Sequence, residues 1–406
     1  MSGVAPRLRG IEAFPVDQDG ERYLALRDPA GYTAAVVMLP LALLDVLALF
    51  DGEHDVDEIQ ARLGQPHGEV VPREFIEKLI TALDKHGFLE GPAFAARRAA
   101  MDDAFLAAAS RPAHHAGAAY PDDPGRLRAT MDGFFAPPEG PGPVEPFRGG
   151  GVSGLVAPHI DFHRGGPAYA WAYRDLAERG EADLFVIFGT CHAGMADPFA
   201  LTSKDYDTPL GPARVDREFV HALARRARQD CFGSELAHRH EHSIEFQTVF
   251  LQYLYGGRRE ITIVPVLTSF VHEALARDTH PEDDARVPAF LDALRDTVAT
   301  SGRRVVFIAG ADLAHVGPRF GDPAPVSPAG LTAIDREDRQ LLAAVEAGDA
   351  AAFFDAARRD GDRRRICGLS PIYTVLRALG GTRGTLRRYG QWPDPQGVVS
   401  FASVVF

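Results

Sequence analysis

The sequence predicts an α/β protein in which a mostly parallel sheet is flanked by helices, with a small α+β domain in front of it. Short apolar runs alternate with helical stripes from Gly151 to the end of the chain, which is the pattern of a parallel sheet. The chain has 406 residues and is too long for one typical core. We therefore expect one large domain and one small domain.

Residues 1–95 are expected to form the small domain. β-Branched and aromatic residues on both sides of a turn at 28–31 indicate a hairpin. Three stretches with helical spacing of apolar residues follow it, at 41–50, 55–63 and 75–83. A hairpin with three helices predicts a winged-helix arrangement.

Two segments of this small domain are similar to the PqqD-like peptide-recognition domains. They read LLDVLALFDGEHDVDEIQARL and FIEKLITALDKHGFLEG. The resemblance implies that the domain binds a precursor peptide along the edge of its sheet. A docking or dimerisation module without a peptide ligand is the alternative. Residues 96–110 are alanine-rich and are expected to form a helical connector to the large domain at 111–406.

The large domain is expected to alternate strands and helices around one proline-rich loop. The loop spans 136–151. Strands are predicted at 152–157, 184–189, 261–267, 304–310, 384–389 and 397–406. Helices are predicted at 123–135, 167–178, 216–228, 243–255 and 288–300.

Composition excludes several classes of protein. A formal charge of -13 argues against a nucleic-acid binder, which normally presents a basic face. The first residues lack the apolar core of a signal peptide, and the most apolar stretch, 34–50, is interrupted by Pro40 and Asp45. Three scattered cysteines are too few for a disulfide framework. A cytoplasmic protein that does not enter a membrane is the expectation.

Histidines follow three of the predicted strands directly. His159 and His192 come after the strands at 152–157 and 184–189, and Asp312 and His315 come after a third strand. The carboxyl ends of parallel strands line one crevice, so these side chains are expected to converge. Two imidazoles and a carboxylate suit iron(II), and zinc uses similar ligands. The pattern predicts a metal site with His159, His192 and Asp312 as ligands.

Other polar residues are candidates for supporting or catalytic roles. His242 lies at the start of a predicted helix, and it can serve as a general acid/base or support a ligand, or have a structural role only. Ser243 can cap that helix, and Glu245 stands in its first turn. Tyr206 lies in a long loop and can donate a hydrogen bond to substrate or simply pack. Cys191 beside His192 suggests a nucleophile. We disfavour this interpretation, because adjacent residues at the end of a strand point in different directions.

Seven ordered motifs resemble the MEMO family over residues 111–406. They read APHIDFHRGGPAYAWAY, VIFGTCHAG, YDTPLGPARVD, HRHEHSIEFQTVFLQYL, ITIVPVL, IAGADLAHVGPRFG and ICGLSPIYTVLRAL. The resemblance implies the fold of class III extradiol dioxygenases, which are non-heme iron(II) enzymes. It implies a pocket built from His159, His192 and the segment 311–315. It further implies iron or copper binding, and a role as protein B of the AmmeMemoRadiSam system beside a radical SAM protein.

Two departures from the family pattern affect the metal. Ala314 stands where some members carry a cysteine ligand, which weakens the case for copper. Asp161 follows the first histidine closely. It can ligate metal, orient His159, or pair with Arg164, and ligation is the least favoured of the three.

The leading functional hypothesis is therefore a divalent-metal redox protein, with iron(II) first and copper or zinc as alternatives. Asp312, His242 or His315 would complete or support the metal site, and His242 or His315 would move protons. Asp161 and Glu245 would support the ligands. The N-terminal domain would deliver a precursor peptide or a radical SAM partner. The alternatives are a catalytically silent scaffold that binds peptides or partners, and a zinc-dependent hydrolase.

Overall fold

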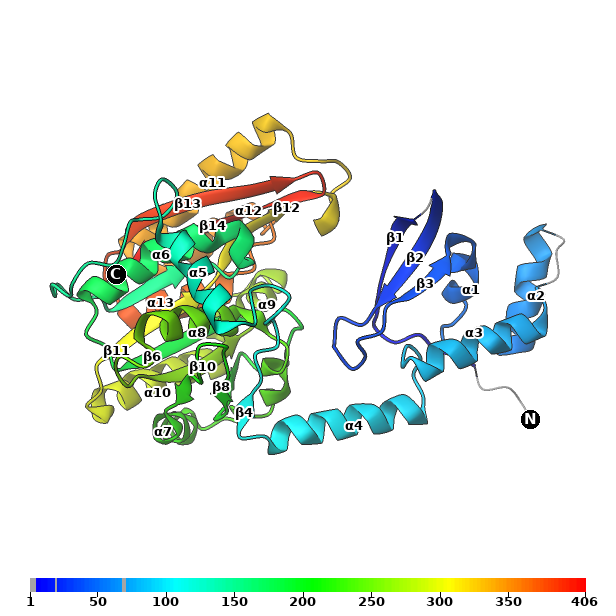
Figure 1. Cartoon of the computed structure of the whole chain (residues 1–406), viewed down its shortest axis with the longest axis horizontal. Coiled ribbons are helices and arrows are strands. Elements are labelled where there is room, and N and C mark those ends of the chain that lie inside the picture. Colours follow the sequence, from blue (N-terminus) through cyan, green and yellow to red (C-terminus); the bar gives the residue numbers. More distant parts are fainter. Residues whose placement is uncertain (1–4, 19, 68–70) are drawn as a thin grey trace. The chain divides into compact units, whose positions relative to one another are not determined.

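A computed structural model describes residues 5–18, 20–67 and 71–406 (Figure 1). The chain divides into two compact units, Met1–Ala107 and Ala108–Phe406. Helix α4 (Pro92–Ala107), where the sequence predicts a connector, is part of the first unit.

The first unit contains a three-stranded antiparallel sheet followed by helices. The strands are β1 (Glu12–Gln18), β2 (Glu21–Arg27) and β3 (Val37–Pro40), in the order β1-β2-β3. The helices are η1 (Leu41–Leu43), α1 (Leu44–Ala48), α2 (Val56–His67), α3 (Arg73–Lys85) and α4. The antiparallel pairing of β2 with β3 confirms the predicted hairpin and the α+β class. The winged-helix assignment and the PqqD-like resemblance remain predictions.

The loop of this hairpin is longer than the sequence predicted. Residues 28–36 connect the two strands. Asp28 holds the loop in shape, because its carboxylate accepts hydrogen bonds from the backbone N–H groups of Ala30, Tyr32 and Thr33. The same carboxylate forms a buried ion pair with Arg9 at 2.9 Å. Strand β1 was not predicted, because its mostly exposed residues lack an alternating apolar pattern.

The second unit is built on a nine-stranded sheet whose four central strands are parallel. These are β5 (Gly154–Ala157), β11 (Val305–Gly310), β6 (Leu184–Thr190) and β10 (Thr262–Thr268), adjacent in that order. The predicted central strands are therefore confirmed. The strands that flank them are β12 (Asp312–Val316), β13 (Thr385–Asp394), β14 (Gly397–Val405), β7 (Phe199–Leu201) and β9 (Arg214–Val215).

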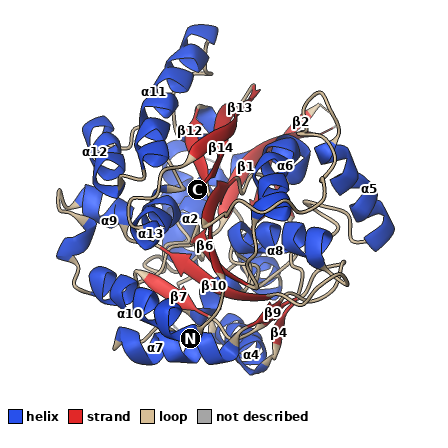
Figure 2. Ribbon diagram, turned by 90° about the vertical axis from the view of Figure 1, so that its left-hand side faces the viewer, coloured by secondary structure: helices blue, strands red, loops and turns tan. Residues whose placement is uncertain are grey.

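Helices cover both faces of this sheet, which explains why strand β6 is buried at every position and carries no polar side chain before Thr190. Figure 2 shows α5 (Pro124–Phe135), α6 (Phe162–Arg179) and α8 (His242–Tyr255) on one face and α10 (Arg286–Ser301) and α13 (Leu369–Leu379) on the other. The other helices of the unit are α7 (Arg217–Ala227), α9 (Val271–Ala276), α11 (Pro328–Ala347), α12 (Ala350–Asp360), η2 (Glu235–His238), η3 (Pro281–Asp283) and η4 (Pro318–Phe320). A separate parallel pair joins β4 (Ser110–Arg111) to β8 (Asp205–Tyr206).

Two glycines let helix α8 approach the carboxyl ends of β6 and β11. A Cβ atom on Gly189 would lie 2.5 Å from Oγ of Ser243, and one on Gly310 would lie 2.4 Å from the carbonyl oxygen of Ser243. Contacts this short do not occur between unstrained atoms, so a larger residue would push the helix away. The first turn of α8 is thereby set against the strand ends.

Among the described residues, none of the helices combines the length and apolar character that a membrane crossing requires.

Candidate metal centre

Three imidazole rings meet at the carboxyl ends of the central strands. His159 follows β5, His192 follows β6, and His242 is the first residue of α8. Each ring offers a ligand atom, and these three atoms all lie within 4.8 Å of one another. The ring centroids are 4.9 Å apart for His159 and His192, and 4.7 Å apart for His192 and His242. This spacing allows one metal ion to contact all three.

The Nδ1 atoms of the three rings are held by protein oxygens. His159 Nδ1 lies 2.9 Å from the carbonyl oxygen of Gly310. Oε1 of Glu241 lies 3.0 Å from Nδ1 of His192 and 3.3 Å from Nδ1 of His242. An imidazole that donates from one nitrogen to a carbonyl or carboxylate presents the lone pair of the other, and metal-binding histidines usually have such partners. The Nε2 atoms are thus the nitrogens that could bind a metal, and that of His159 also lies 3.0 Å from Sγ of Cys367.

Glu241 ties the second and third histidines to the start of helix α8. Its side chain is the N-cap of α8 and accepts a hydrogen bond from the backbone N–H of Ser243 at 2.9 Å. It also accepts one from the backbone N–H of His192 at 2.9 Å. The predicted cap, Ser243, instead donates its hydroxyl to the carbonyl oxygen of Thr190. Sequence reasoning missed Glu241, although its place directly before His242 in the histidine-rich segment was a usable signal.

Burial and Glu241 set the charge of the centre. Burial lowers the pKa of His159 to about 3 and the pKa of His242 to about 3, so both rings stay neutral. Burial opposes charge on His192 as well, but the Glu241 carboxylate outweighs it and raises the pKa of that ring. Although burial works against ionisation of Glu241, His192 holds the pKa of this carboxyl well below its usual range. Two neutral imidazoles and one anionic support suit a cation.

The sequence of the second unit matches a known protein family. The sequence model of the Memo family, described as Memo-like protein, matches residues 111–405 of the 406-residue chain. The chain belongs to the Memo family. The three histidines lie within the matched residues, so the centre is part of the Memo-like unit.

Curated relatives agree with this assignment. A MEMO1 family protein of Aquifex aeolicus is 29% identical over 406 residues, which cover 98% of this chain and 99% of the relative. One of Methanopyrus kandleri is 32% identical over 302 residues, covering 72% and 96%, respectively. One of Methanococcoides burtonii is 31% identical over 261 residues, covering 63% and 86%. The similarity to the Aquifex protein extends over most of the N-terminal unit too.

Asp312, predicted as the third ligand of the Memo centre, is not part of the three-residue group. It is the first residue of β12, and its Oδ1 accepts a hydrogen bond from the backbone N–H of His159 at 3.0 Å. Its Oδ2 lies 3.7 Å from Nε2 of His159. Burial raises the pKa of Asp312 to about 6. His242, which was considered as a residue that could complete or support the site or carry protons, is the third member of the group that could hold a metal.

His315 and Asp161 lie outside the group of three. His315 Nδ1 is 3.0 Å from the carbonyl oxygen of Leu313, and its ring packs edge-on against Phe320. Asp161 forms an ion pair with Arg164, which is one of the three roles considered for it. Neither residue is among the ligand atoms that converge.

Tyr206 and Glu245 belong to a buried network behind the centre. The Tyr206 hydroxyl lies 2.8 Å from Nδ1 of His238, and the residue is fully buried. Among the described contacts, its hydroxyl is thus directed to a buried histidine inside the protein. Glu245 pairs with the buried Arg111 at 2.6 Å, and Arg111 also donates to the carbonyl oxygen of Glu241 at 2.7 Å. Glu245 therefore supports the backbone of the segment that carries His242.

A cysteine that sequence reasoning did not connect with the site lies against the first histidine. Sγ of Cys367 is 3.0 Å from Nε2 of His159. Burial raises the pKa of Cys367 well above its usual value, so the group is a neutral thiol. The motif ICGLS contained the signal, since it places Cys367 just before α13.

Ala314, at the position where some family members carry a cysteine, is fully buried and packs with Ile334 and Val398.

The donor set suits a borderline divalent metal. Three neutral or supported imidazoles bind zinc, copper, iron and nickel, and the set does not select one of them.

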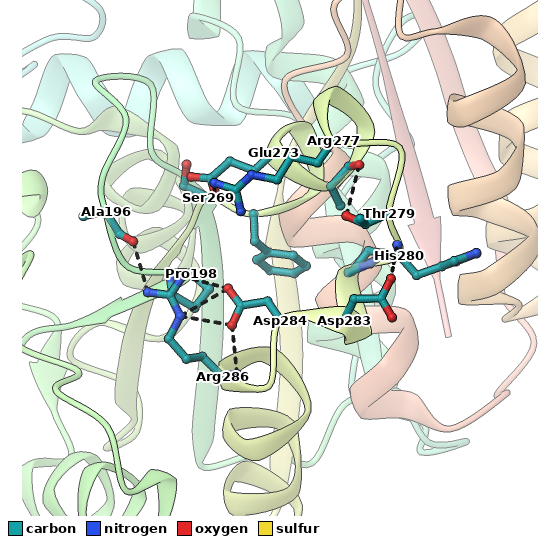
Figure 3. A pocket seen from close by; sticks show the side chains of 13 residues that line it. Ala196, Pro198, Ser269, Glu273, Arg277, Thr279, His280, Asp283, Asp284 and Arg286 are labelled. Atoms are coloured by element: carbon teal, nitrogen blue, oxygen red, sulfur yellow. Dashed lines mark hydrogen bonds and ion pairs between the residues drawn. The ribbon is translucent and has the colours of Figure 1, made fainter.

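A separate cavity of about 220 Å³ lies beyond the end of β10, lined by Phe270, Arg277 and Arg286 among others (Figure 3). Its charged groups are paired with each other, as Arg286 is with Asp284 at 2.7 Å, and no histidine of the centre lines it.

Proposed function

We propose that this Memo-family protein binds a divalent transition metal through His159, His192 and His242 and acts as an iron(II) redox protein. One observation carries the proposal: the three ligand atoms lie within 4.8 Å of one another while Gly310 and Glu241 hold the opposite ring nitrogens. An iron(II) ion held by three protein ligands keeps open positions for oxygen or a substrate group.

The protein's own groups would manage protons beside such an ion. The carboxyl of Asp312 is 3.7 Å from Nε2 of His159, and its pKa of about 6 permits proton exchange near neutral pH. His315 lies on the same strand and is half-buried. Glu241 would keep His192 and His242 oriented while a substrate binds and leaves.

Metal analysis tests the proposal directly. Protein purified anaerobically and reconstituted with Fe²⁺ should retain about one iron per chain after desalting. The His159→Ala/His192→Ala double variant should retain almost none, while a His221→Ala/His280→Ala variant, which removes two exposed histidines elsewhere, should match the wild type. Equal iron content in the site variant and the wild type would reject the assignment.

Zinc-dependent hydrolysis is the second candidate, because the converging set consists of three imidazoles without a carboxylate. Three histidines with an open fourth position form one of the catalytic zinc arrangements. This candidate predicts activity that persists without oxygen and disappears with a chelator. Activity that requires oxygen would favour the iron proposal instead.

We further propose that the N-terminal unit docks a precursor peptide, as the PqqD-like resemblance implies. Strand β3 is at the edge of the described sheet, and the side chains of Val36 and Met38 beside and within it are exposed. An extended peptide can add to such an edge by backbone hydrogen bonds. Met38→Pro should abolish peptide binding while metal content stays unchanged. Capture of a radical SAM protein without a peptide would favour the partner-docking reading, and partner binding without metal would favour a silent scaffold.

A further inference from the structure

A second cavity lies at the amino ends of the central strands, whereas the candidate metal centre lies at their carboxyl ends. Its volume is about 430 Å³, within the range of small-molecule pockets, and it is lined by the segments that precede β6, β10 and β11. These strands are adjacent in the sheet. A strand of seven residues spans about 23 Å, so the cavity is remote from the histidines at the other ends of these strands.

Three arginines surround this cavity in a chain whose formal charge is -13. They are Arg258, Arg259 and Arg304, with Glu181 as the acidic residue of the lining. Arg304 reaches Glu181 and Asp183 only at 3.7 Å and is 62% exposed on its side chain. Its hydrogen-bonding capacity is therefore largely directed to solvent.

Arg259 has an unsatisfied donor. Its guanidinium stacks on the ring of Tyr255 at 4.1 Å, and its Nη2 atom is buried without a hydrogen-bond partner in the described structure. Buried donors without a partner are rare in folded proteins, because an unpaired buried donor destabilises the fold. Arg259 as a whole is half-buried, so an anion in the cavity would contact the exposed part of its side chain rather than the buried Nη2 atom. The planar guanidinium offers paired donors that suit a phosphate or a carboxylate.

The other wall of the cavity is apolar and held in place. Phe147 is 53% exposed, and Leu254 lies in the same lining. The loop that carries Phe147 is fixed by the buried Glu178, which accepts a hydrogen bond from the backbone N–H of Glu145 at 2.9 Å and pairs with Arg148. Anchoring an exposed aromatic ring beside arginines creates a surface with one charged and one apolar side.

We propose that this cavity binds a small organic anion, a phosphate or carboxylate that carries an apolar group. The anionic end contacts Arg259 and Arg304, and the apolar end contacts Phe147 and Leu254. The site is independent of the metal proposal, because the two share no lining residue.

Calorimetry on the full-length chain tests the proposal with phenyl phosphate, benzoate, inorganic phosphate and phenol as probes. Phenyl phosphate or benzoate should bind once per chain and at least tenfold more tightly than inorganic phosphate, and phenol should not bind measurably. Whichever of the two organic anions binds more tightly identifies the preferred charged group. No saturable binding of either one would overturn the proposal.

Variants locate the binding. Arg304→Gln changes an exposed side chain, so the fold should persist, and affinity should fall about tenfold or more. Arg259→Gln should have the same effect. Phe147→Ser should weaken the organic anions severalfold and leave inorganic phosphate unchanged. Arg295→Gln, on the exposed side of α10, is the matched control and should bind as the wild type does. Wild-type affinity in both arginine variants of the cavity would place the ligand elsewhere and refute the assignment.

Discussion

The carboxylate of Glu241 lies 3.0 Å from Nδ1 of His192, and the same oxygen caps helix α8. One buried acid therefore couples the orientation of a ligand at a strand end to the start of a helix. We expect Glu241→Gln to lower metal affinity about 10–100-fold, because such partners fix the ring and its tautomer. Competition with a chromogenic chelator measures the change. The variant should remain folded by circular dichroism, and unchanged affinity in a folded variant would contradict this role.

Close packing of α8 on the sheet gives a second prediction. In Gly310→Ala, the added methyl group would meet the carbonyl oxygen of Ser243 at 2.4 Å, so the helix must move and take His242 with it. Metal content should fall, and the free energy of unfolding should fall by about 1–3 kcal/mol. Gly133→Ala is the control, because a Cβ atom there meets nothing within 4 Å. Equal metal content in the Gly310→Ala and Gly133→Ala variants would contradict the prediction, because metal binding would then not depend on the close packing of α8 against the sheet.

The buried pair of Arg111 and Glu245 gives a third prediction. Both side chains are fully buried. Arg111→Met leaves the Glu245 charge without its partner and should cost about 3–5 kcal/mol of stability in urea unfolding. The Arg111→Met/Glu245→Gln double variant should be more stable than the single variant, because no uncompensated charge remains.

An exposed pair provides the comparison for that experiment. Arg295 and Asp292 pair at 2.8 Å with most of their side-chain surfaces exposed. Arg295→Met should cost no more than about 1 kcal/mol. A loss in Arg111→Met as small as this would mean that water reaches Glu245 in solution.

Acid sensitivity gives a fourth prediction, centred on His238. Burial lowers the pKa of this ring to about 3, and the neutral ring contacts Tyr206 and the carbonyl oxygen of Ala200. The pKa is below its unfolded value of about 6.5, so the contribution to stability is complete above pH 6.5 and is lost as pH falls towards 3. The expected slope is up to about 1.4 kcal/mol per pH unit.

Comparison with His238→Gln isolates this effect. The variant should be less stable than the wild type at pH 7, and the difference should narrow between pH 6.5 and 4.5. Urea unfolding at several pH values measures it. A stability difference that stays constant with pH would show that His238 does not take up a proton on unfolding.

The sequence predicted the central strands correctly because helices bury them on both faces, which leaves continuous apolar runs such as that of β6. It predicted the helices 123–135 and 243–255 to within a residue or so for a similar reason, since their apolar stripes are regular. It missed β1, which is mostly exposed and so carries no apolar signal. Element type follows from local periodicity, whereas an exposed strand depends on its neighbour.

The histidines at the strand ends were recognised from sequence, but sequence position alone did not single out His242 as the third residue of the group that could hold a metal. Asp312 and His242 were both candidates. Asp312 begins strand β12, which pairs antiparallel with β14, and its carboxylate accepts a hydrogen bond from the backbone N–H of His159. His242 reaches the group because two glycines admit the first turn of α8. Neither the strand reversal nor the close approach leaves a local pattern.

The amino-acid sequence by itself determined the central strands, the helices with regular apolar stripes, the Memo motifs and the convergence of His159 and His192, because periodicity and chain direction fix which residues end a buried strand. Only the tertiary structure decided that His242 completes the group, that Glu241 holds two of its rings and that Cys367 touches the first. The contacts of Glu241 with His192 and of Cys367 with His159 join residues 49 and 208 positions apart. They depend on how closely helices and loops pack against the sheet, and that packing is a property of the whole fold.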